Sequence, residues 1–270
     1  MNGPTGAGSH DQQRLWLERA NSSRLYNWLL GDVWNMRPDR VAAHAITQVA
    51  PWARTAALIN REFAERSVGV AAARGIRQFL DLGCGYPVRH GQNTHELAEG
   101  DYRVVYADHD WCVLAHARTA LEQSPRERVV RADVRAMNAF LTSPEVREVI
   151  DLSQPVAVGL HDVLPWIESD AVSRSLRVLR EWMPPGSLLS CTHFTGHWHP
   201  GTVDAVVKAY ANHLLDIYPR SRDEIAALFG GLVHLGPGLT APHHWHPSSK
   251  FRRRPPEEAA AFAGIAFKPL

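Results

Sequence analysis

Cysteine is scarce in this chain of 270 residues, with only Cys84, Cys112 and Cys191 present. Their spacing is not that of metal ligands, and their odd number does not suit a disulfide framework, so we expect a reducing compartment. No apolar run approaches the roughly 18 residues of a membrane span. The first residues have neither the basic nor the apolar region of a signal peptide. The sequence therefore predicts a cytoplasmic protein with no membrane partner.

The chain also has little excess charge of either sign. Twenty-nine basic and 28 acidic residues give a formal net charge of +1. Affinity for a phosphate backbone requires a concentrated basic face, which this balance argues against. We therefore expect no nucleic-acid partner and favour a small-molecule substrate.

Residues 1–74 show no strand signal. Residues 1–12 are rich in glycine and polar residues, which predicts a disordered tail. Within residues 13–74, Leu25, Trp28 and Leu29 stand at helical spacing, and prolines separate two further helical stretches. This pattern predicts an N-terminal helical cap over residues 13–74.

From Gly75 onward, short apolar strands alternate with longer helices. We expect strands over residues 78–82, 103–107, 129–132, 155–160 and 187–192, and helices over 111–122, 170–182, 202–217 and 223–229. Residues 232–235 and 264–267 suit an antiparallel edge pair. Such alternation predicts the α/β class, with residues 75–270 forming a Rossmann-like, doubly wound and mostly parallel sheet.

The first strand ends in the glycine-rich turn Asp81-Leu-Gly83-Cys-Gly85. In the dinucleotide fingerprint a third glycine follows three residues later, and a helix N-terminus holds a pyrophosphate. Val88 stands at that position here. Asp81 would repel a pyrophosphate but attract a cationic ligand, so the turn argues against a nicotinamide dinucleotide.

Acidic residues also end the next two strands. Asp108 follows the second strand, where a carboxylate can accept hydrogen bonds from ribose hydroxyls. Asp133 ends the third strand, where an adenine amino group could be bound. The alternative interpretation is that each of these residues is a helix N-cap, a position that favours aspartate.

With these residues in place, the sequence resembles class I S-adenosylmethionine-dependent methyltransferases, and more narrowly a bacterial S-adenosyl methyltransferase family formerly grouped as a domain of unknown function. The resemblance covers nearly the whole chain from Ser22. The motifs that carry it are Ser23-Arg-Leu-Tyr-Asn-Trp-Leu-Leu-Gly31, Asp39-Arg40, Asn60-Arg61-Glu-Phe63, Gly75-Ile-Arg-Gln-Phe-Leu-Asp-Leu-Gly83, Val104-Val-Tyr-Ala-Asp108, Leu114-Ala-His-Ala-Arg118, Pro184-Pro-Gly186-Ser, Leu228-Phe-Gly-Gly-Leu232, Pro237-Gly238-Leu and Trp245-His-Pro247.

The resemblance implies S-adenosyl-L-methionine as the cofactor and assigns its pocket. Asp81, Gly83 and Gly85 would line the methionyl end. The remaining residues that the resemblance implies for cofactor binding are Asp108 with its neighbour His109 at the ribose, Asp133 and Val134 at the adenine, and Tyr26 closing over the cofactor from the helical cap.

The chain departs from the family pattern near the expected pocket mouth. Asp32-Val-Trp34-Asn35-Met36 replaces the usual Gly-Lys-Asp-Asn-Phe, so the family does not assign the acceptor. Aromatic faces attract cations, and Trp34, Trp198 and His193 are candidate substrate contacts.

His161 and Asp162, directly after the fourth strand, are the candidate catalytic residues. In this fold their position faces the group to be transferred, and a neutral imidazole there could take a proton from an acceptor hydroxyl or amine. The alternative is a structural histidine that holds the loop. His193, His197 and His199 lack a regular metal-binding pattern, so no metal is expected.

Together these features predict a methyltransferase that uses S-adenosylmethionine to modify a small molecule, in biosynthesis or specialised metabolism. One alternative shares the cofactor but not the reaction: cyclisation or cleavage of its aminobutyrate arm, with release of methylthioadenosine. A non-catalytic regulator that binds the cofactor is a further alternative. The sequence shows no appended DNA-reading motif, which argues against this alternative.

Overall fold

The structure, a computed structural model, describes residues 17–89, 91–98 and 100–269. The tail expected over residues 1–12 lies outside the described residues. Among those residues, no helix combines the length and the apolar character needed to cross a membrane.

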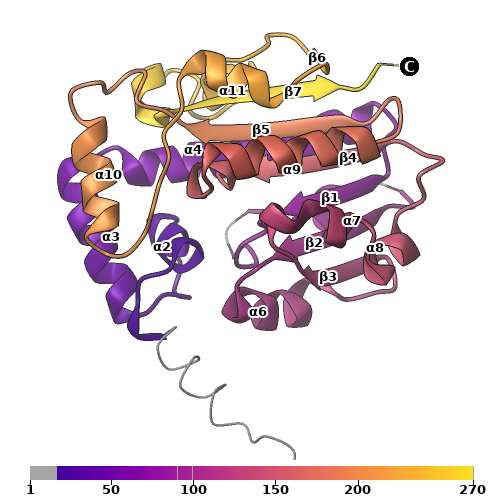
Figure 1. Ribbon diagram of the computed structural model, residues 1–270, viewed down its shortest axis with the longest axis horizontal. Coiled ribbons are helices and arrows are strands. Elements are labelled where there is room, and N and C mark those ends of the chain that lie inside the picture. Colours follow the sequence, from indigo (N-terminus) through magenta and orange to yellow (C-terminus); the bar gives the residue numbers. More distant parts are fainter. Residues whose placement is uncertain (1–16, 90, 99, 270) are drawn as a thin grey trace, which may run out of the picture.

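A seven-stranded, mostly parallel sheet forms the centre of the molecule (Figure 1). Its strand order is β3-β2-β1-β4-β5-β7-β6. The first five strands pair in parallel, and β7 pairs antiparallel with both β5 and β6. The strands are β1 (Gln78–Leu82), β2 (Arg103–Asp108), β3 (Glu127–Arg131), β4 (Val156–His161), β5 (Leu188–Phe194), β6 (Val233–His234) and β7 (Ala261–Phe267). The Rossmann-like α/β architecture and the antiparallel edge pair expected from the sequence are confirmed.

Helices precede the sheet and cover both of its faces. The helices α2, α3 and α4 occur before β1, in the stretch where the sequence shows no strand signal. The α-helices are α2 (Ser22–Leu29), α3 (Arg37–Val49), α4 (Ala53–Ala73), α5 (Thr94–Leu97), α6 (Trp111–Leu121), α7 (Met137–Leu141), α8 (Pro144–Val149), α9 (Ser169–Trp182), α10 (Val203–Ala211) and α11 (Arg222–Leu228).

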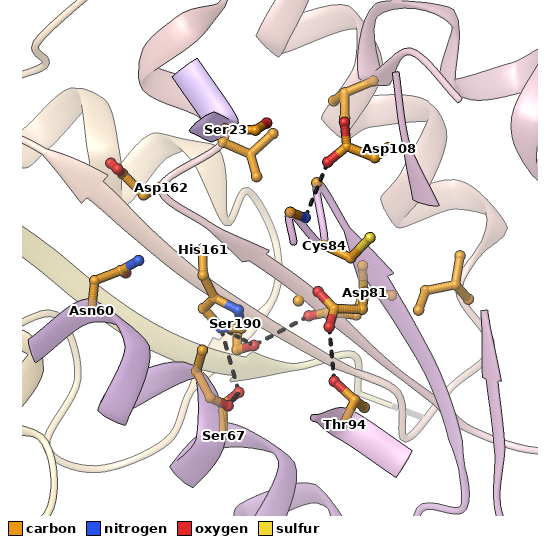
Figure 2. Close-up of a pocket in the computed structure, with 18 of the residues that line it drawn as sticks. Ser23, Asn60, Ser67, Asp81, Cys84, Thr94, Asp108, His161, Asp162 and Ser190 are labelled. Carbon is orange, nitrogen blue, oxygen red and sulfur yellow. Dashed lines mark hydrogen bonds between the residues drawn. The ribbon is translucent and has the colours of Figure 1, made fainter. Parts of the chain in front are cut away.

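Side-chain alternation along the strands directs a set of polar residues to the sheet face that α4 and α6 cover. In β1, Phe79 packs on that face while Leu80 and Leu82 pack on the other. Asp81 has the same parity as Phe79, since successive strand residues point to opposite faces. In β4, His161 likewise alternates with the apolar Leu160. Figure 2 shows the resulting group, which includes Asp81, His161 and Ser190 of β5.

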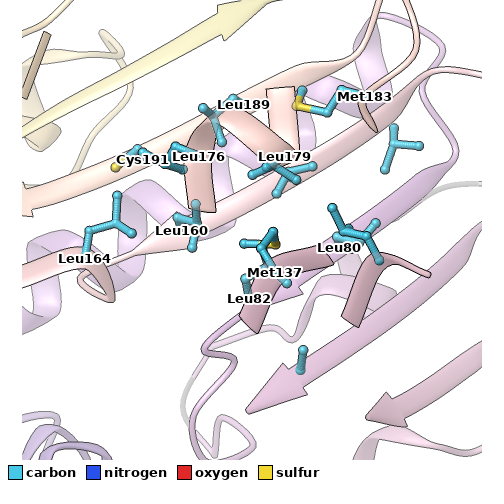
Figure 3. Close-up of a cluster of buried hydrophobic side chains, with 14 of the residues drawn as sticks. Leu80, Leu82, Met137, Leu160, Leu164, Leu176, Leu179, Met183, Leu189 and Cys191 are labelled. Carbon is cyan, nitrogen blue, oxygen red and sulfur yellow. The ribbon is translucent and has the colours of Figure 1, made fainter. Parts of the chain in front are cut away.

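The opposite face of the sheet carries the larger apolar core (Figure 3). Leu176 and Leu179 of α9 are at i and i+3 on one helix face and are almost completely buried. They meet strand residues such as Leu80, Leu160 and Leu189. This apolar layer fixes the strands whose carboxyl ends carry the polar residues described above.

A buried ion pair ties α2 to the start of α3. Arg24 Nε lies 2.7 Å from Asp39 Oδ2, and both side chains are fully buried. The Asp39 carboxylate also accepts hydrogen bonds from the backbone N–H groups of Asn21 and Met36. These contacts set the position of α2, which carries Tyr26.

The helix expected over residues 202–217 is shorter in the structure. α10 ends at Ala211, and Leu214 takes a left-handed conformation with φ of 62°. The Arg220 guanidinium donates to the backbone oxygens of Leu164 and Ile167, which anchors the following loop. Tertiary hydrogen bonds of this kind override local helical periodicity.

The structure also adds α7 and α8 between β3 and β4, where the sequence pattern predicts no element.

Candidate active site

A cavity of about 360 Å³ opens at the carboxyl ends of the parallel strands. It lies between the sheet and the helices α2 and α4, at the place where ligands bind in open α/β sheets. Ten residues that the sequence singled out line this cavity: Tyr26, Asp81, Gly83, Gly85, Asp108, His109, Asp133, Val134, His161 and Asp162. The fold therefore brings together residues separated by up to 136 positions.

The two glycines of the turn after β1 differ in what surrounds them. Both have left-handed backbones, with φ of 70° at Gly83 and 65° at Gly85. A Cβ on Gly83 would lie 2.4 Å from Val163 Cγ2, whereas a Cβ on Gly85 would meet no heavy atom within 4 Å. Gly83 is thus required for packing inside the protein. Gly85 presents its backbone to open space, which is the geometry that suits close approach of a ligand.

We expect Gly83→Ala to destabilise the protein more than Gly85→Ala. Gly85→Ala adds only the left-handed strain of an L-residue, about 1 kcal/mol, while Gly83→Ala adds the clash with Val163. Urea unfolding of both variants measures the difference. Val163→Ala should relieve part of the Gly83→Ala defect in the double variant, and strict additivity of the two losses would contradict the assigned clash.

Asp108 ends β2, and only 3% of its side chain is exposed. Oδ2 accepts a hydrogen bond from Gly85 N at 3.1 Å, and Oδ1 accepts one from Asp110 N at 2.9 Å. Burial raises the pKa of Asp108, and the two N–H donors oppose that rise. Each carboxylate oxygen can accept more than one bond, so capacity for ligand hydroxyls is left. Asp108 is not a helix N-cap, because Asp110 caps α6 instead.

Asp81 and Arg61 place opposite charges on the cavity wall. Asp81 Oδ2 accepts a hydrogen bond from Thr94 Oγ1 at 2.8 Å, and burial raises the pKa of Asp81. Arg61 of α4 donates to Gln92 O at 2.6 Å and pairs with Glu65 at 3.3 Å. An amino-acid group carries one cation and one anion, so this wall could bind the ammonium of a methionyl group through Asp81 and its carboxylate through Arg61.

Asp133 has a double role at the far end of the cavity. Its carboxylate accepts the Arg135 backbone N–H as the N-cap of the short 3-10 helix η1 (Val134–Ala136). It also forms an ion pair with the Arg135 guanidinium at 2.6 Å, and these bonds lower the pKa of Asp133. The capping alternative thus holds for Asp133, although its side chain also lines the cavity.

His161 is held as a neutral ring. Its Nε2 lies 3.0 Å from Ser190 Oγ and 3.4 Å from Ser67 Oγ. Burial, assisted by the positive charge of Arg61, lowers the pKa of His161 to about 3. A group with so low a pKa is a weak base near neutral pH. The environment therefore fits a positioning role better than proton transfer.

The carboxyl group of Asp162, unlike the ring of His161, has a pKa close to neutral pH. Its backbone is left-handed with φ of 58°. Its N–H donates to Thr192 Oγ1 at 2.8 Å, and its carbonyl accepts the Trp166 indole N–H at 2.8 Å. Within the part of the chain that the structure describes, its carboxylate forms no hydrogen bond or ion pair. Burial raises the pKa of Asp162 to about 7. A strained backbone and a carboxyl near neutral pKa are typical of functional positions.

Asn60 is a central residue of the site to which the sequence pattern assigns no role. Its amide nitrogen donates to Tyr26 Oη at 2.7 Å, and its amide oxygen accepts from Thr192 Oγ1. Thr192 in turn accepts the Asp162 N–H. This chain joins α2, α4 and β5 to the Asp162 backbone. A sequence signal did exist, because Asn60 belongs to the motif Asn60-Arg61-Glu-Phe63, on which the family resemblance partly rests.

Three expected substrate contacts lie away from the cavity. Trp34 is 40% exposed and packs against His116 in a tilted arrangement, with the ring centroids 3.9 Å apart. Trp198 packs on Phe262 at 4.5 Å. His193 is fully buried with its Nε2 2.6 Å from Arg220 Nη1, because strand alternation turns it away from the face that Thr192 occupies. The geometry gives these three residues no contact with the cavity.

Metal binding also finds no support in the geometry. Among residues 17–89, 91–98 and 100–269, no three His, Cys, Asp or Glu side chains are grouped as a metal site would require. His199 Nε2 instead bonds Glu257 O at 2.8 Å.

Comparison with known proteins identifies the family of this chain. A family model described as S-adenosyl methyltransferase matches residues 8–269. A candidate methyltransferase from Thermobifida fusca is 34% identical, with a TM-score of 0.87 over 93% of this chain and 96% of that chain. A DUF574 family protein from Streptomyces avermitilis is 32% identical, also with a TM-score of 0.87, over 94% and 99%.

More distant likeness extends to the fold alone. The N-methyltransferase NodS from Bradyrhizobium japonicum, in complex with S-adenosylhomocysteine, is 11% identical with a TM-score of 0.50, over 78% of this chain and 88% of that chain. A comparison of the sequence with curated proteins found no match. The family model and the two structures above 30% identity establish that this chain belongs to the S-adenosyl methyltransferase family, whose cofactor is S-adenosylmethionine.

Proposed function

We propose that this protein methylates a small molecule in a cytoplasmic biosynthetic pathway of specialised metabolism. The observation that carries the proposal is the cavity of about 360 Å³, whose lining brings the glycine turn and the acidic strand ends together with the consecutive residues His161 and Asp162. A formal net charge of +1 supports a small acceptor over a nucleic acid. Three free cysteines support a reducing compartment.

The proposed cofactor contacts follow from the charges on the cavity wall. Asp108 would bind the ribose hydroxyls, with His109 beside it, and Asp133 with Val134 would border the adenine. Asp81 and Arg61 would hold the amino-acid end, while Gly83 and Gly85 shape the turn beneath it. We treat residues 13–74 as a helical cap that supplies Tyr26, and residues 75–270 as the cofactor-binding domain.

The residues of the chain contribute binding, orientation and proton transfer. When bound, the cofactor supplies a methyl group already activated on a sulfonium, so positioning of the acceptor accounts for much of the rate. The Tyr26–Asn60–Thr192 chain fixes the backbone of Asp162. The Asp162 carboxylate accepts the proton that the acceptor must lose, while neutral His161 holds the adjoining wall through Ser190.

Fractionation of a bacterial extract tests the size of the acceptor. The extract is divided by ultrafiltration and each part is incubated with the protein and methyl-labelled S-adenosylmethionine. We expect labelled products and S-adenosylhomocysteine with the low-mass fraction. Label confined to protein or nucleic acid of the high-mass fraction would contradict a small-molecule acceptor.

Exhaustive chelation should leave the activity unchanged. No grouped metal ligands occur in the described residues, and the proposed mechanism uses only side-chain and cofactor chemistry. S-adenosylhomocysteine formation is measured before and after EDTA treatment and dialysis. A loss that one divalent metal restores would overturn this expectation.

A further inference from the structure

A second, smaller cavity adjoins the proposed cofactor cavity. Its volume is about 60 Å³, and Tyr26, Asn60, Asp162 and Trp166 line both cavities. A molecule in the small cavity would therefore share a wall with a molecule in the large one. This is the arrangement that a transfer between two bound molecules requires.

The small cavity is apolar away from this shared wall. Its lining includes Leu29, Ile46, Trp52, Phe194 and Ile217. Trp166 packs its edge against Tyr210 at a ring-centroid distance of 5.3 Å, and this fixes the aromatic side of the cavity. Among the described residues that line it, none is Lys, Arg or His. The lining thus offers a ligand aromatic and aliphatic contacts without any positive charge.

Among the described residues on this lining, Asp162 is the one acidic residue, and it lies at the junction of the two cavities. Among the residues drawn in Figure 2, no hydrogen bond reaches its carboxylate. Its backbone N–H and C=O are both engaged, by Thr192 and Trp166, so the side chain is directed by a fixed and strained backbone. A carboxylate that is sheltered from water and has no cationic partner is stabilised when a ligand supplies the cation.

We propose that the small cavity is the acceptor subsite, and that the acceptor is a small amine whose nitrogen binds Asp162 and whose compact apolar group fills the cavity. This inference rests on the proposed methyltransfer to a small molecule. Aromatic walls favour a cationic group, and Asp162 would repel an acidic one. An engineered cavity of roughly 150 Å³ holds benzene. The apolar group is therefore smaller than a phenyl ring, as a short branched alkyl chain is.

The chemistry balances with Asp162 as the proton acceptor. The ammonium group gives one proton to the carboxylate, and the freed nitrogen lone pair forms a bond to the methyl carbon. The carbon–sulfur bond breaks with its electron pair on sulfur, which yields S-adenosylhomocysteine. The products are the methylated ammonium and a neutral Asp162, which returns its proton to solvent. Because burial raises the pKa of Asp162 to about 7, the carboxyl can both accept and release a proton near neutral pH.

Fragment binding tests the subsite without any turnover. Isobutylamine, isopropylamine and their matched alcohols are titrated against the protein saturated with S-adenosylhomocysteine, and dissociation constants are taken from ligand-observed NMR. We expect each amine to bind at least tenfold more tightly than its alcohol. Asp162→Asn should remove that preference while leaving the alcohol affinity unchanged.

Filling the cavity gives a second, independent test. Ala56 of α4 is half-buried and lines the small cavity but not the large one. Leucine suits a helix, so Ala56→Leu should weaken amine binding at least tenfold while the affinity for S-adenosylhomocysteine stays within twofold. Ala120→Leu, on the exposed side of α6, is the matched control and should change neither.

The results distinguish a failure of the amine subsite from a failure of the proposed function. Amines that bind no more tightly than their alcohols, or equally well to the wild type and Ala56→Leu, overturn the amine subsite, even where S-adenosylhomocysteine binds and methyl transfer to other acceptors proceeds. A wild-type protein that does not bind S-adenosylhomocysteine would instead contradict the proposed function itself.

Discussion

Asp162→Asn is expected to lower kcat by about 10²- to 10⁴-fold, the contribution typical of a positioned general base. Asparagine has nearly the same shape and tolerates the left-handed backbone that Asp162 adopts, so the local structure should be kept. The affinity for S-adenosylmethionine, measured by calorimetry, should change far less than kcat. A variant that retains wild-type kcat would show that Asp162 takes no proton.

The pH dependence of the activity is a second test of Asp162 as the proton acceptor. Asp162 acts as a base only when ionised, and burial raises its pKa to about 7. Activity should therefore fall as the pH decreases through about 7, and this limb should be missing from the residual activity of Asp162→Asn. A bound sulfonium favours the ionised carboxylate, so the limb should lie at lower pH in kcat than the titration of the free protein.

The contribution of Asp162 to the free energy of unfolding should change with pH in the direction opposite to the activity. A carboxyl whose pKa is raised by folding contributes stability below its ordinary pKa, and this contribution is lost as the pH rises through about 7. At pH 8 the wild type keeps a buried charge that Asp162→Asn lacks. The variant should then be at least as stable as the wild type in urea at pH 8, which separates a loss of catalysis from a loss of folding.

Asp108→Ala should weaken S-adenosylmethionine binding by about 1.5–3 kcal/mol, the usual contribution of a hydrogen bond to a charged group. The substitution removes the proposed ribose acceptor. It also removes the acceptor for Gly85 N, which orients the turn under the cofactor. Calorimetry on the folded variant measures the change, and circular dichroism confirms that the variant is folded.

Asp101→Ala is the matched control for Asp108→Ala. Asp101 forms an exposed pair with Arg126 at 3.2 Å, with 81% of its side chain accessible. Exposed pairs contribute little, and Asp101 does not line the cavity. Its replacement should leave cofactor affinity unchanged. Equal affinities for Asp108→Ala, Asp101→Ala and the wild type would rule out the ribose contact.

Much of the fold and of the cavity could be predicted because the relevant signals are local. Strand residues alternate between the two faces of the sheet, and this alternation can be recognised within each strand. The parallel register that pairs Asp81 with Gly159 then puts Asp81 and His161 on one face. Parallel strands then bring their carboxyl ends to one edge. The turn at Gly83 and Gly85 could also be predicted from a local signal, because its left-handed backbone conformations favour glycine.

The remaining features depend on contacts between distant parts of the chain. Asn60 and Thr192 are 132 residues apart, and neither residue type reveals their hydrogen bond. The early end of α10 likewise depends on the anchoring of the following loop by Arg220. Trp34 and Trp198 are candidates on side-chain chemistry alone, which does not reveal their ring contacts with His116 and Phe262.

The nucleoside product of S-adenosylmethionine tests the account most directly. The purified protein is incubated with S-adenosylmethionine alone and with the low-mass fraction of an extract, and the products are separated by liquid chromatography with mass spectrometry. We predict S-adenosylhomocysteine only when the fraction is present, in equal amount to a new methylated compound. Methylthioadenosine formed by the enzyme without any acceptor would contradict methyl transfer.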